Sequence, residues 1–403
     1  MSADAPADTS AELRRPARLL GSRHALTTYH VLLGATLLLL LLGLAMVLSA
    51  STIVSYQTLG SPYTLFLRQL LFAGVGLVAM VLASRLPVSF YRRLAYPALA
   101  VALVLLVAVL FVGVSVNGQR NWIELGGPFR LQPSEFAKLA LVLWIADLLA
   151  RKQPLLDQWK HLLVPLLPVS VAIVALVLLE GDVGNALVLI PMVAVALFVA
   201  GAPLRLFAVG AVAVLTLVAM ASMSVGYRMD RFRGWLDPES DPSDLGWQVL
   251  HGKSALGGGG WFGVGLGGSR EKWGWLPAAH TDFIYAVVGE ELGVIGSVLV
   301  VVLFAAVAVA GLRVALAARD RFVRVASTMV VAWLLTQAIL NLGAVLQLLP
   351  ITGVPLPLVS YGGSSLVPTL VALGMLMSFA RHERRTGRAR RPAGSIDLTE
   401  RRT

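Results

Sequence analysis

Residues 276–293 read LPAAHTDFIYAVVGEELG, and this stretch carries an aspartate to the start of a long apolar run. Asp282 begins the run, which continues to about residue 310, and Glu290 and Glu291 follow two helical turns further along. Ionisable side chains within or beside membrane spans are energetically costly, usually face a cavity or a partner, and mark functional sites. The stretch therefore predicts a membrane span with a candidate site at its mouth.

The composition of the chain indicates that most of it lies in lipid. Of its 403 residues, 57% are hydrophobic and only 14% are charged, whereas a soluble domain carries roughly 25% charged residues. The mean hydropathy is +0.78. The absence of cysteine excludes disulfides, thiol catalysis and cysteine metal sites.

Ten segments are long and apolar enough to cross a membrane, which takes about 20 residues in a helix. They are residues 31–53, 66–84, 95–116, 134–150, 161–180, 185–201, 204–225, 281–310, 323–348 and 363–380. The sequence thus predicts an all-α polytopic membrane protein with ten transmembrane helices. Its membrane domain is expected at 31–380, between basic tails at 1–30 and 381–403.

The distribution of basic residues predicts the orientation of the chain. With the N-terminus inside, 23 of the 33 lysines and arginines fall in the tails or in cytoplasmic loops, as the positive-inside rule requires. Both termini are then cytoplasmic, and a large extracytoplasmic loop at 226–280 separates helices 7 and 8. The net charge is +11, and the basic tails are expected to bind anionic lipid. No nucleic acid partner is expected.

Three cations of the outer face have few acids near them in sequence. Arg120, Arg130 and Lys138 have only Glu124 and Glu135 as local partners. Structural pairing and binding of an anionic ligand both remain open for this trio. An amphiphile with an anionic head and a lipid tail would suit cations that lie beside apolar helices.

The last outer segment, LPITGVPLPLVSYGGSS at 349–365, is rich in proline, glycine and serine. Irregular backbone at membrane depth is tolerated only where protein or a water-filled cavity covers it. The segment is therefore either a re-entrant, cavity-lining loop or a plain tight turn. In a re-entrant loop, the hydroxyls of Ser360 and Ser364 can hold a polar substrate.

Four long motifs resemble the SEDS family of shape, elongation, division and sporulation proteins. They are NGQRNWIELGGPFRLQPSEFAK (117–138), EGDVGNAL (180–187), GVGLGGSREKWGWLPAAHTDFIYAVVGEELG (263–293) and NLGAVLQLLPITGVPLPLVSYGGSS (341–365). The GGSREK and SYGGSS elements are more similar to the division members than to the elongation members. The resemblance extends from about residue 30 to 380.

This resemblance implies ten transmembrane helices and peptidoglycan glycosyltransferase activity on lipid II, the undecaprenyl-pyrophosphate-linked disaccharide peptide. It also implies a class B penicillin-binding protein and other divisome membrane proteins as partners, at the septum of the bacterial cytoplasmic membrane. The family's catalytic aspartate falls on Asp282, its sensitive cations on Arg130 and Lys138, and the neighbouring acid on Glu135. Ala278 stands where the family often has glutamate, which puts in doubt a role for that acid but not for Asp282.

The chemistry of glycosyl transfer is consistent with these residues. A base must take a proton from the acceptor hydroxyl, and cations must hold the pyrophosphate as negative charge develops. We expect Asp282 to be the base, and Arg130, Lys138 and Lys272 to bind pyrophosphate. A divalent ion, Mg²⁺ or Mn²⁺, can share this work, although no ligand cluster in the sequence demands a metal. Thr281-Asp282 is also good helix-capping chemistry, so a purely structural role stays open.

Two other functions compete with polymerisation. A lipid II flippase would also use cations at membrane depth, broken helices and a proline-rich loop. However, no inverted repeat is apparent, and the polar residues concentrate in the outer half. A non-catalytic division scaffold would explain the number of spans but not an aspartate and cations on the same face.

Overall fold

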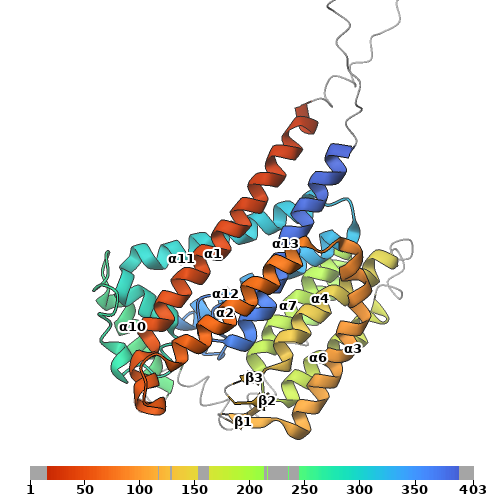
Figure 1. Ribbon diagram of the computed structural model, residues 1–403. Coiled ribbons are helices and arrows are strands. Elements are labelled where there is room, and N and C mark those ends of the chain that lie inside the picture. Colours follow the sequence, from red (N-terminus) through yellow and green to blue (C-terminus); the bar gives the residue numbers. More distant parts are fainter. Residues whose placement is uncertain are drawn as a thin grey trace, which may run out of the picture.

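The computed structural model describes residues 16–116, 118–127, 129–152, 163–212, 216, 235 and 245–389. The described part is mainly helical (Figure 1). Its helices are α1 (Pro16–Leu59), α2 (Thr64–Arg85), α3 (Val88–Val112), α4 (Pro133–Arg151), α6 (Leu166–Leu179), α7 (Val183–Ala200), α10 (Leu245–Gly258), η4 (Glu271–Trp273), α11 (Ile284–Ala317), α12 (Arg321–Val345) and α13 (Gly363–Ala389).

Seven helices of the described part are long and apolar enough to cross a membrane, and they lie in α1, α2, α3, α7, α11, α12 and α13. The fold is therefore that of a polytopic helical membrane protein. Of the other predicted spans, α4 carries four charged side chains and α6 has only 14 residues. Residues 204–212 are helical. The rest of the predicted span 204–225, apart from Thr216, lies outside the described residues, as does the first part of the predicted loop, residues 226–244, apart from Trp235.

A small antiparallel sheet interrupts the helices, which the all-α prediction did not include. Its strands are β1 (Val114–Val116), β2 (Gln119–Gly126) and β3 (Phe129–Leu131), in the order β1-β2-β3. The predicted span 95–116 is wrong at both ends, because α3 begins at Val88 and ends at Val112. Gly113 caps α3 in an extended conformation, and the polar, glycine-containing stretch that follows pairs with itself instead of continuing the helix.

The predicted span 281–310 corresponds to α11, which extends to Ala317 and consists of two helical pieces that meet at Gly293. Gly293 has φ 67° and ψ −164°, a backbone conformation that only glycine adopts readily. The loop before α11 packs into this break, where a Cβ on Gly293 would lie 2.5 Å from the backbone nitrogen of Gly263. The backbone N–H of Val294 donates to the carbonyl of Gly260 at 2.9 Å.

The two ends of the helical bundle differ in chemistry. The start of α1 and the end of α13 lie together at the top of Figure 1, and the sheet lies at the bottom. Near the start of α3, Arg92 pairs with Asp320, the N-cap of α12, and near the end of α13 the Arg381 guanidinium donates to the Tyr29 hydroxyl of α1 at 2.8 Å. Arg321 donates to the carbonyl of Ala200, the last residue of α7, at 3.2 Å. Basic residues from the start of α3, the start of α12 and the end of α13 thus gather at one end, and the predicted site residues belong to the other.

Close helix contacts hold the core of the bundle. Helix α13 packs along α2, α3 along α4, and α1 along α11. A Cβ on Gly374 would lie 2.4 Å from the carbonyl oxygen of Met80, so α13 and α2 touch backbone to backbone. Small residues permit such approaches where lipid provides no hydrophobic driving force between helices.

Candidate active site

Asp282 lies in the turn that leads into α11. The helix begins at Ile284, with Phe283 at the cap position and no side-chain capping hydrogen bond. Asp282 is therefore not the N-cap that the sequence left open as an alternative. Its carbonyl accepts a hydrogen bond from Asn341 Nδ2 of α12 at 2.8 Å, and its side chain is half-buried. Helix α12 thus fixes the turn, while part of the side chain stays accessible.

The loop between α12 and α13 re-enters the bundle, which confirms the re-entrant interpretation of this segment. It reaches the middle of α1, where a Cβ on Gly43 would lie 2.3 Å from the carbonyl oxygen of Leu358. Val359 and Ser360 are buried there. Gln69 of α2 binds the loop from the other side, donating to the Ser360 carbonyl at 3.2 Å and accepting from the Gly362 N–H at 3.2 Å.

Ser360 joins the re-entrant loop to the turn that carries Asp282. Its hydroxyl donates to the carbonyl of Thr281 at 2.6 Å and accepts from the N–H of Leu356 at 2.9 Å. The N–H of Tyr361 donates to the carbonyl of His280 at 2.9 Å. The Ser360 hydroxyl is therefore engaged within the protein and sets the position of the turn.

The stretch 352–354 of the loop lies between Asp282 and the start of α7. Of the described atoms, only Asp282 Oδ2 would lie within 4 Å of a Cβ on Gly353, at 3.9 Å. On the other side, a Cβ on Gly184 would lie 2.6 Å from the carbonyl oxygen of Thr352. The Cβ direction of Gly353 thus has room for a methyl group and faces the Asp282 carboxylate.

Asp182 organises the polar cluster at the start of α7. It is the N-cap of this helix and accepts from the backbone N–H of Asn185 at 3.0 Å. Its Oδ2 also accepts from Asn185 Nδ2 and Gln132 Nε2, both at 2.8 Å. Asp182 thus forms a structural turn, which also connects α7 to the chain before α4.

Lys138 and Glu135 form a fully buried pair on α4. Lys138 Nζ lies 2.8 Å from Glu135 Oε1, with side-chain exposures of 0% and 1%. The same ammonium donates to Asn185 Oδ1 at 3.0 Å and lies 5.1 Å from the centre of the Trp333 ring. The structural pairing of these two residues is therefore present, and the lysine charge lies beneath the Asp182 cluster.

Arg130 lies on β3 near the Tyr361 end of the re-entrant loop. It pairs with Glu124 at 3.1 Å, and both side chains are about half exposed, at 50% and 51%. Burial raises the pKa of Tyr361, and the positive charges of Arg68 and Arg130 act against this rise. The Tyr361 ring lies 5.7 Å from that of His280, whose pKa is lowered by burial. The re-entrant loop and the segment 280–282 thus bring Arg130 into the same region as Asp282.

The other two cations of the predicted site lie elsewhere. Arg120 donates to the carbonyls of Gly113 and Leu110 at the end of α3, both at 3.0 Å. Lys272 is buried against α1 and α11, where it pairs with Glu291 at 3.2 Å. The structure therefore groups Arg130, Lys138, Glu135, Ser360 and Ser364 around the re-entrant loop, with Arg120 and Lys272 directed to their own partners.

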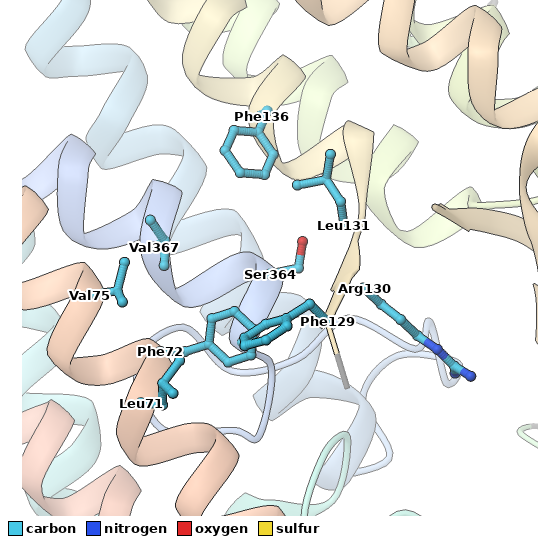
Figure 2. Close-up of a pocket in the computed structure, with 10 residues that line it drawn as sticks. Leu71, Phe72, Val75, Phe129, Arg130, Leu131, Phe136, Ser364 and Val367 are labelled. Atoms are coloured by element: carbon cyan, nitrogen blue, oxygen red, sulfur yellow. The ribbon is translucent and has the colours of Figure 1, made fainter. Parts of the chain in front are cut away.

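An apolar groove begins beside Arg130 (Figure 2). It has a volume of about 390 Å³. Its lining comes from α2, β3, α4 and α13 and includes Phe72, Phe129, Phe136 and Val367. Ser364 lines it as well, and its hydroxyl accepts from the backbone N–H of Gln132 at 2.8 Å. In Figure 2 the Arg130 guanidinium extends away from these apolar side chains. The groove therefore offers apolar surface next to a cation.

Several buried polar atoms around the re-entrant loop lack a hydrogen-bond partner within the described part of the chain. They are Glu135 Oε2, both carboxyl oxygens of Glu180, His280 Nδ1, Asn341 Oδ1 and Thr352 Oγ1. Buried polar groups are nearly always satisfied, so water or the polar groups of a ligand would complete them. The residues described include no group of three or more His, Asp or Glu side chains suited to hold a metal ion.

Arg68, Gln69, Asn341 and Tyr361 belong to this region and were not predicted as site residues. Gln69 and Asn341 are buried polar residues within apolar helices. Such residues are rare and carry a functional signal, which could have identified both. No comparable signal exists for Tyr361, because its place depends on how the loop folds.

A helical membrane bundle with an acidic turn, cations and an apolar groove at one end places the chain in the class of polytopic membrane proteins. The chain belongs to the family of cell cycle proteins that includes FtsW, RodA and SpoVE, because the model of that family matches residues 29–385.

The names of two similar proteins agree with this assignment. The chain is 41% identical over 360 residues to the probable peptidoglycan glycosyltransferase FtsW of Mycobacterium tuberculosis, covering 89% of this chain and 68% of the relative. It is 37% identical over 352 residues to stage V sporulation protein E of Bacillus subtilis, covering 87% and 96%.

Solved structures share the fold. A chain from the study "Structural coordination of polymerization and crosslinking by a peptidoglycan synthase complex" matches with a TM-score of 0.68 and 35% identity, covering 85% of this chain and 97% of that one. The rod shape determining protein RodA of Thermus thermophilus matches with a TM-score of 0.65 and 32% identity, covering 87% and 96%.

Proposed function

We propose that this chain polymerises lipid II into glycan strands at the outer face of the bacterial cytoplasmic membrane, for septal wall synthesis. Its relatives carry the name of peptidoglycan glycosyltransferases, and the chain is an enzyme of that class. The observation that carries the proposal is the room in the Cβ direction of Gly353, which faces the Asp282 carboxylate. Arg130 and the apolar groove lie in the same region.

In the proposed reaction, Asp282 accepts the proton of the acceptor sugar hydroxyl. The acceptor oxygen forms a bond to the anomeric carbon of the donor, and the bond from that carbon to the pyrophosphate oxygen breaks. Direct displacement inverts the anomeric centre, and no second carboxylate is needed because no water is activated. The leaving lipid pyrophosphate takes the electron pair, so cations must balance its charge.

Arg130 is the cation best suited to bind the pyrophosphate. Its guanidinium can bind phosphate oxygens in a bidentate manner, and its half-exposed pair with Glu124 is of a kind that contributes little to stability. The ligand can therefore replace Glu124 at low cost. We assign Lys138 and Glu135 to the wall below the site, where the buried lysine charge acts through Asn185 and Asp182. Arg120 remains a candidate for contact at the rim.

The apolar groove suits the isoprenoid tail of the substrate. Its phenylalanine and valine side chains come from α2, α4, α13 and β3, and Arg130 lies at its border. An apolar chain in the groove would bring its phosphate end towards Arg130, and Ser364 lies along the same lining. This arrangement favours a lipid-linked donor over a soluble sugar nucleotide.

A divalent cation remains a prediction for this site. When bound, Mg²⁺ or Mn²⁺ would help Arg130 to neutralise the negative charge that develops on the pyrophosphate. The described residues offer no cluster of carboxylates and histidines for it.

The chain is further proposed to have ten transmembrane helices, both termini in the cytoplasm and its site outside. The gathering of Arg92, Arg321 and Arg381 at the end opposite the site supports this orientation. A class B penicillin-binding protein and other division proteins are the proposed partners. Support for the first comes from the peptidoglycan synthase complex whose polymerising and crosslinking activities are coordinated.

A lipid II flippase and a non-catalytic scaffold are the competing functions, and one experiment separates them. The full chain, purified with the class B penicillin-binding protein of its organism, is given lipid II in detergent, where no leaflets exist. Glycan polymer from the wild type, lost in Asp282→Asn, is the expected result. A well-folded complex that forms no polymer would contradict the enzyme proposal, and polymer from the variant would remove Asp282 from catalysis.

A further inference from the structure

We infer that Lys272 and Glu291 form a buried lock that positions Asp282, and that Lys272 does not bind substrate. The two residues lie at opposite ends of the segment that contains Asp282. This inference rests on the proposed function, because the position of Asp282 is measured through the polymerisation rate. It replaces the expectation that Lys272 grips the pyrophosphate.

The ammonium group of Lys272 is fully occupied by the protein. Its Nζ donates to Gly267 O at 2.7 Å, to Ser49 Oγ at 3.0 Å and to Glu291 Oε1 at 3.2 Å. A lysine ammonium has three N–H donors and no acceptor. The side chain is only 7% exposed. No donor of Lys272 is therefore left for a phosphate oxygen.

Glu291 and its neighbour Glu290 hold the other side of the lock. Glu291 Oε1 also accepts from the Ser49 hydroxyl at 2.6 Å and from the backbone N–H of Ser269 at 3.3 Å. Glu290 accepts from the Ser269 hydroxyl at 2.5 Å and from the backbone N–H of Arg270 at 2.8 Å. Two adjacent carboxylates thus bind the short stretch 269–272.

The lock closes a loop whose interior contains Asp282. Lys272 and Glu291 are 19 residues apart, and the chain between them passes through the Asp282 turn before it returns along the first piece of α11. Closing a loop restricts the conformations of everything within it. Ser49 attaches the closed loop to α1. The lock therefore limits how far Asp282 can move relative to the helical bundle.

The lock and a substrate-binding lysine respond in opposite ways to a second substitution. Removal of one partner from a buried ion pair leaves the other charge uncompensated, whereas replacement of both by neutral groups of similar size is often tolerated. Loss of Glu291 in addition to Lys272 should thus remove the uncompensated charge, so that neutral side chains of similar size hold the two ends of the segment together in place of the ion pair. It would not rescue a lysine that binds pyrophosphate, because the cation would still be missing.

The test compares Lys272→Met, Glu291→Gln and the double variant in the full chain purified with its penicillin-binding protein. Each complex is assayed for kcat, for the KM of lipid II and for Tm in detergent. The lock predicts that each single variant lowers kcat by roughly tenfold or more with an unchanged KM, and that the double variant returns to within about threefold of wild type. Lys253→Met is the matched control, because this lysine is exposed on α10 and makes none of these contacts.

Two results would overturn the lock. One is a raised KM in Lys272→Met that persists in the double variant, which would assign the lysine to the substrate. The other is a lowered Tm in the single variants with kcat unchanged per folded complex, which would leave the pair a stabilising role alone. Failure of the proposed function is distinguishable, because the wild-type complex itself would then form no polymer.

Discussion

The cations that look alike in the sequence have different environments in the molecule. Arg130 is half exposed in a pair with Glu124, so it can exchange that partner for a ligand. Lys138 is fully buried with Glu135 and lies beneath the Asp182 cluster. Lys272 pairs with Glu291 away from both. Spacing in sequence places charges on helices and loops, but burial and pairing depend on tertiary packing, so these three roles could not be separated beforehand.

Substitution of Arg130 tests its role in binding the pyrophosphate. Arg130→Ala should raise the KM for lipid II by roughly tenfold or more, since a charge-assisted hydrogen bond contributes about 1.5–3 kcal/mol. Arg130→Lys should lie in between, because lysine retains the charge but not the bidentate geometry.

The control for this prediction is Arg93→Ala, an exposed arginine of α3 near its basic end. Steady-state polymerisation over a range of lipid II concentrations provides the measurement. An Arg130→Ala enzyme with the KM of wild type would show that this guanidinium does not bind the donor.

At the scale of elements, the re-entrant loop and the break in α11 assemble the site. The prolines, glycines and serines of 349–365 predicted irregular backbone at membrane depth, and the loop does enter the bundle. Its position between Asp282 and α7 was not predictable, because it results from contacts between segments far apart in sequence. The break at Gly293 was missed for a similar reason. The apolar pattern continues through Gly293. Only the loop that packs against this glycine shows why α11 is broken there.

Leucine at Gly353 should block the space beside Asp282. Gly353 has φ +71° and only the Asp282 carboxylate near its Cβ direction, whereas Gly60 has φ +72° and nothing within 4 Å. In both positions a leucine would cost about 1–2 kcal/mol in the left-handed conformation. Gly353→Leu should therefore abolish polymerisation. Gly60→Leu should lower Tm by about as much as Gly353→Leu does, but it should retain activity.

The check is the rate per folded complex together with Tm for both variants. Equal rates in Gly353→Leu and Gly60→Leu would mean that the space beside Gly353 is not used by the substrate.

At the scale of the whole molecule, composition and hydropathy were sufficient to predict a polytopic helical membrane protein. The charge distribution was sufficient to predict a basic end. The small sheet at 114–131 escaped prediction, because short polar strands that pair locally have no strong periodic signal. The family resemblance is what singles out Asp282 among many acids as the predicted base, since the Thr281-Asp282 sequence by itself also allowed a capping role.

Cysteine labelling tests the proposed orientation, and the chain is suited to it because it has no native cysteine. Ser115 is exposed on β1, and Arg319 is exposed in the turn between α11 and α12. A membrane-impermeant thiol reagent should label Ser115→Cys in intact spheroplasts, and Arg319→Cys only after permeabilisation. The reverse pattern would place the site in the cytoplasm and exclude polymerisation at the outer face.

The central claim is that Asp282 is the base of glycosyl transfer, and the single-turnover rate of Asp282→Asn tests it most directly. The variant complex is mixed with lipid II in detergent, and both bound substrate and polymer are quantified in the same samples. The account predicts that lipid II still binds while the rate falls by about 10²–10⁴-fold, the usual contribution of a general base. A rate within tenfold of wild type, with lipid II bound equally well, would contradict it.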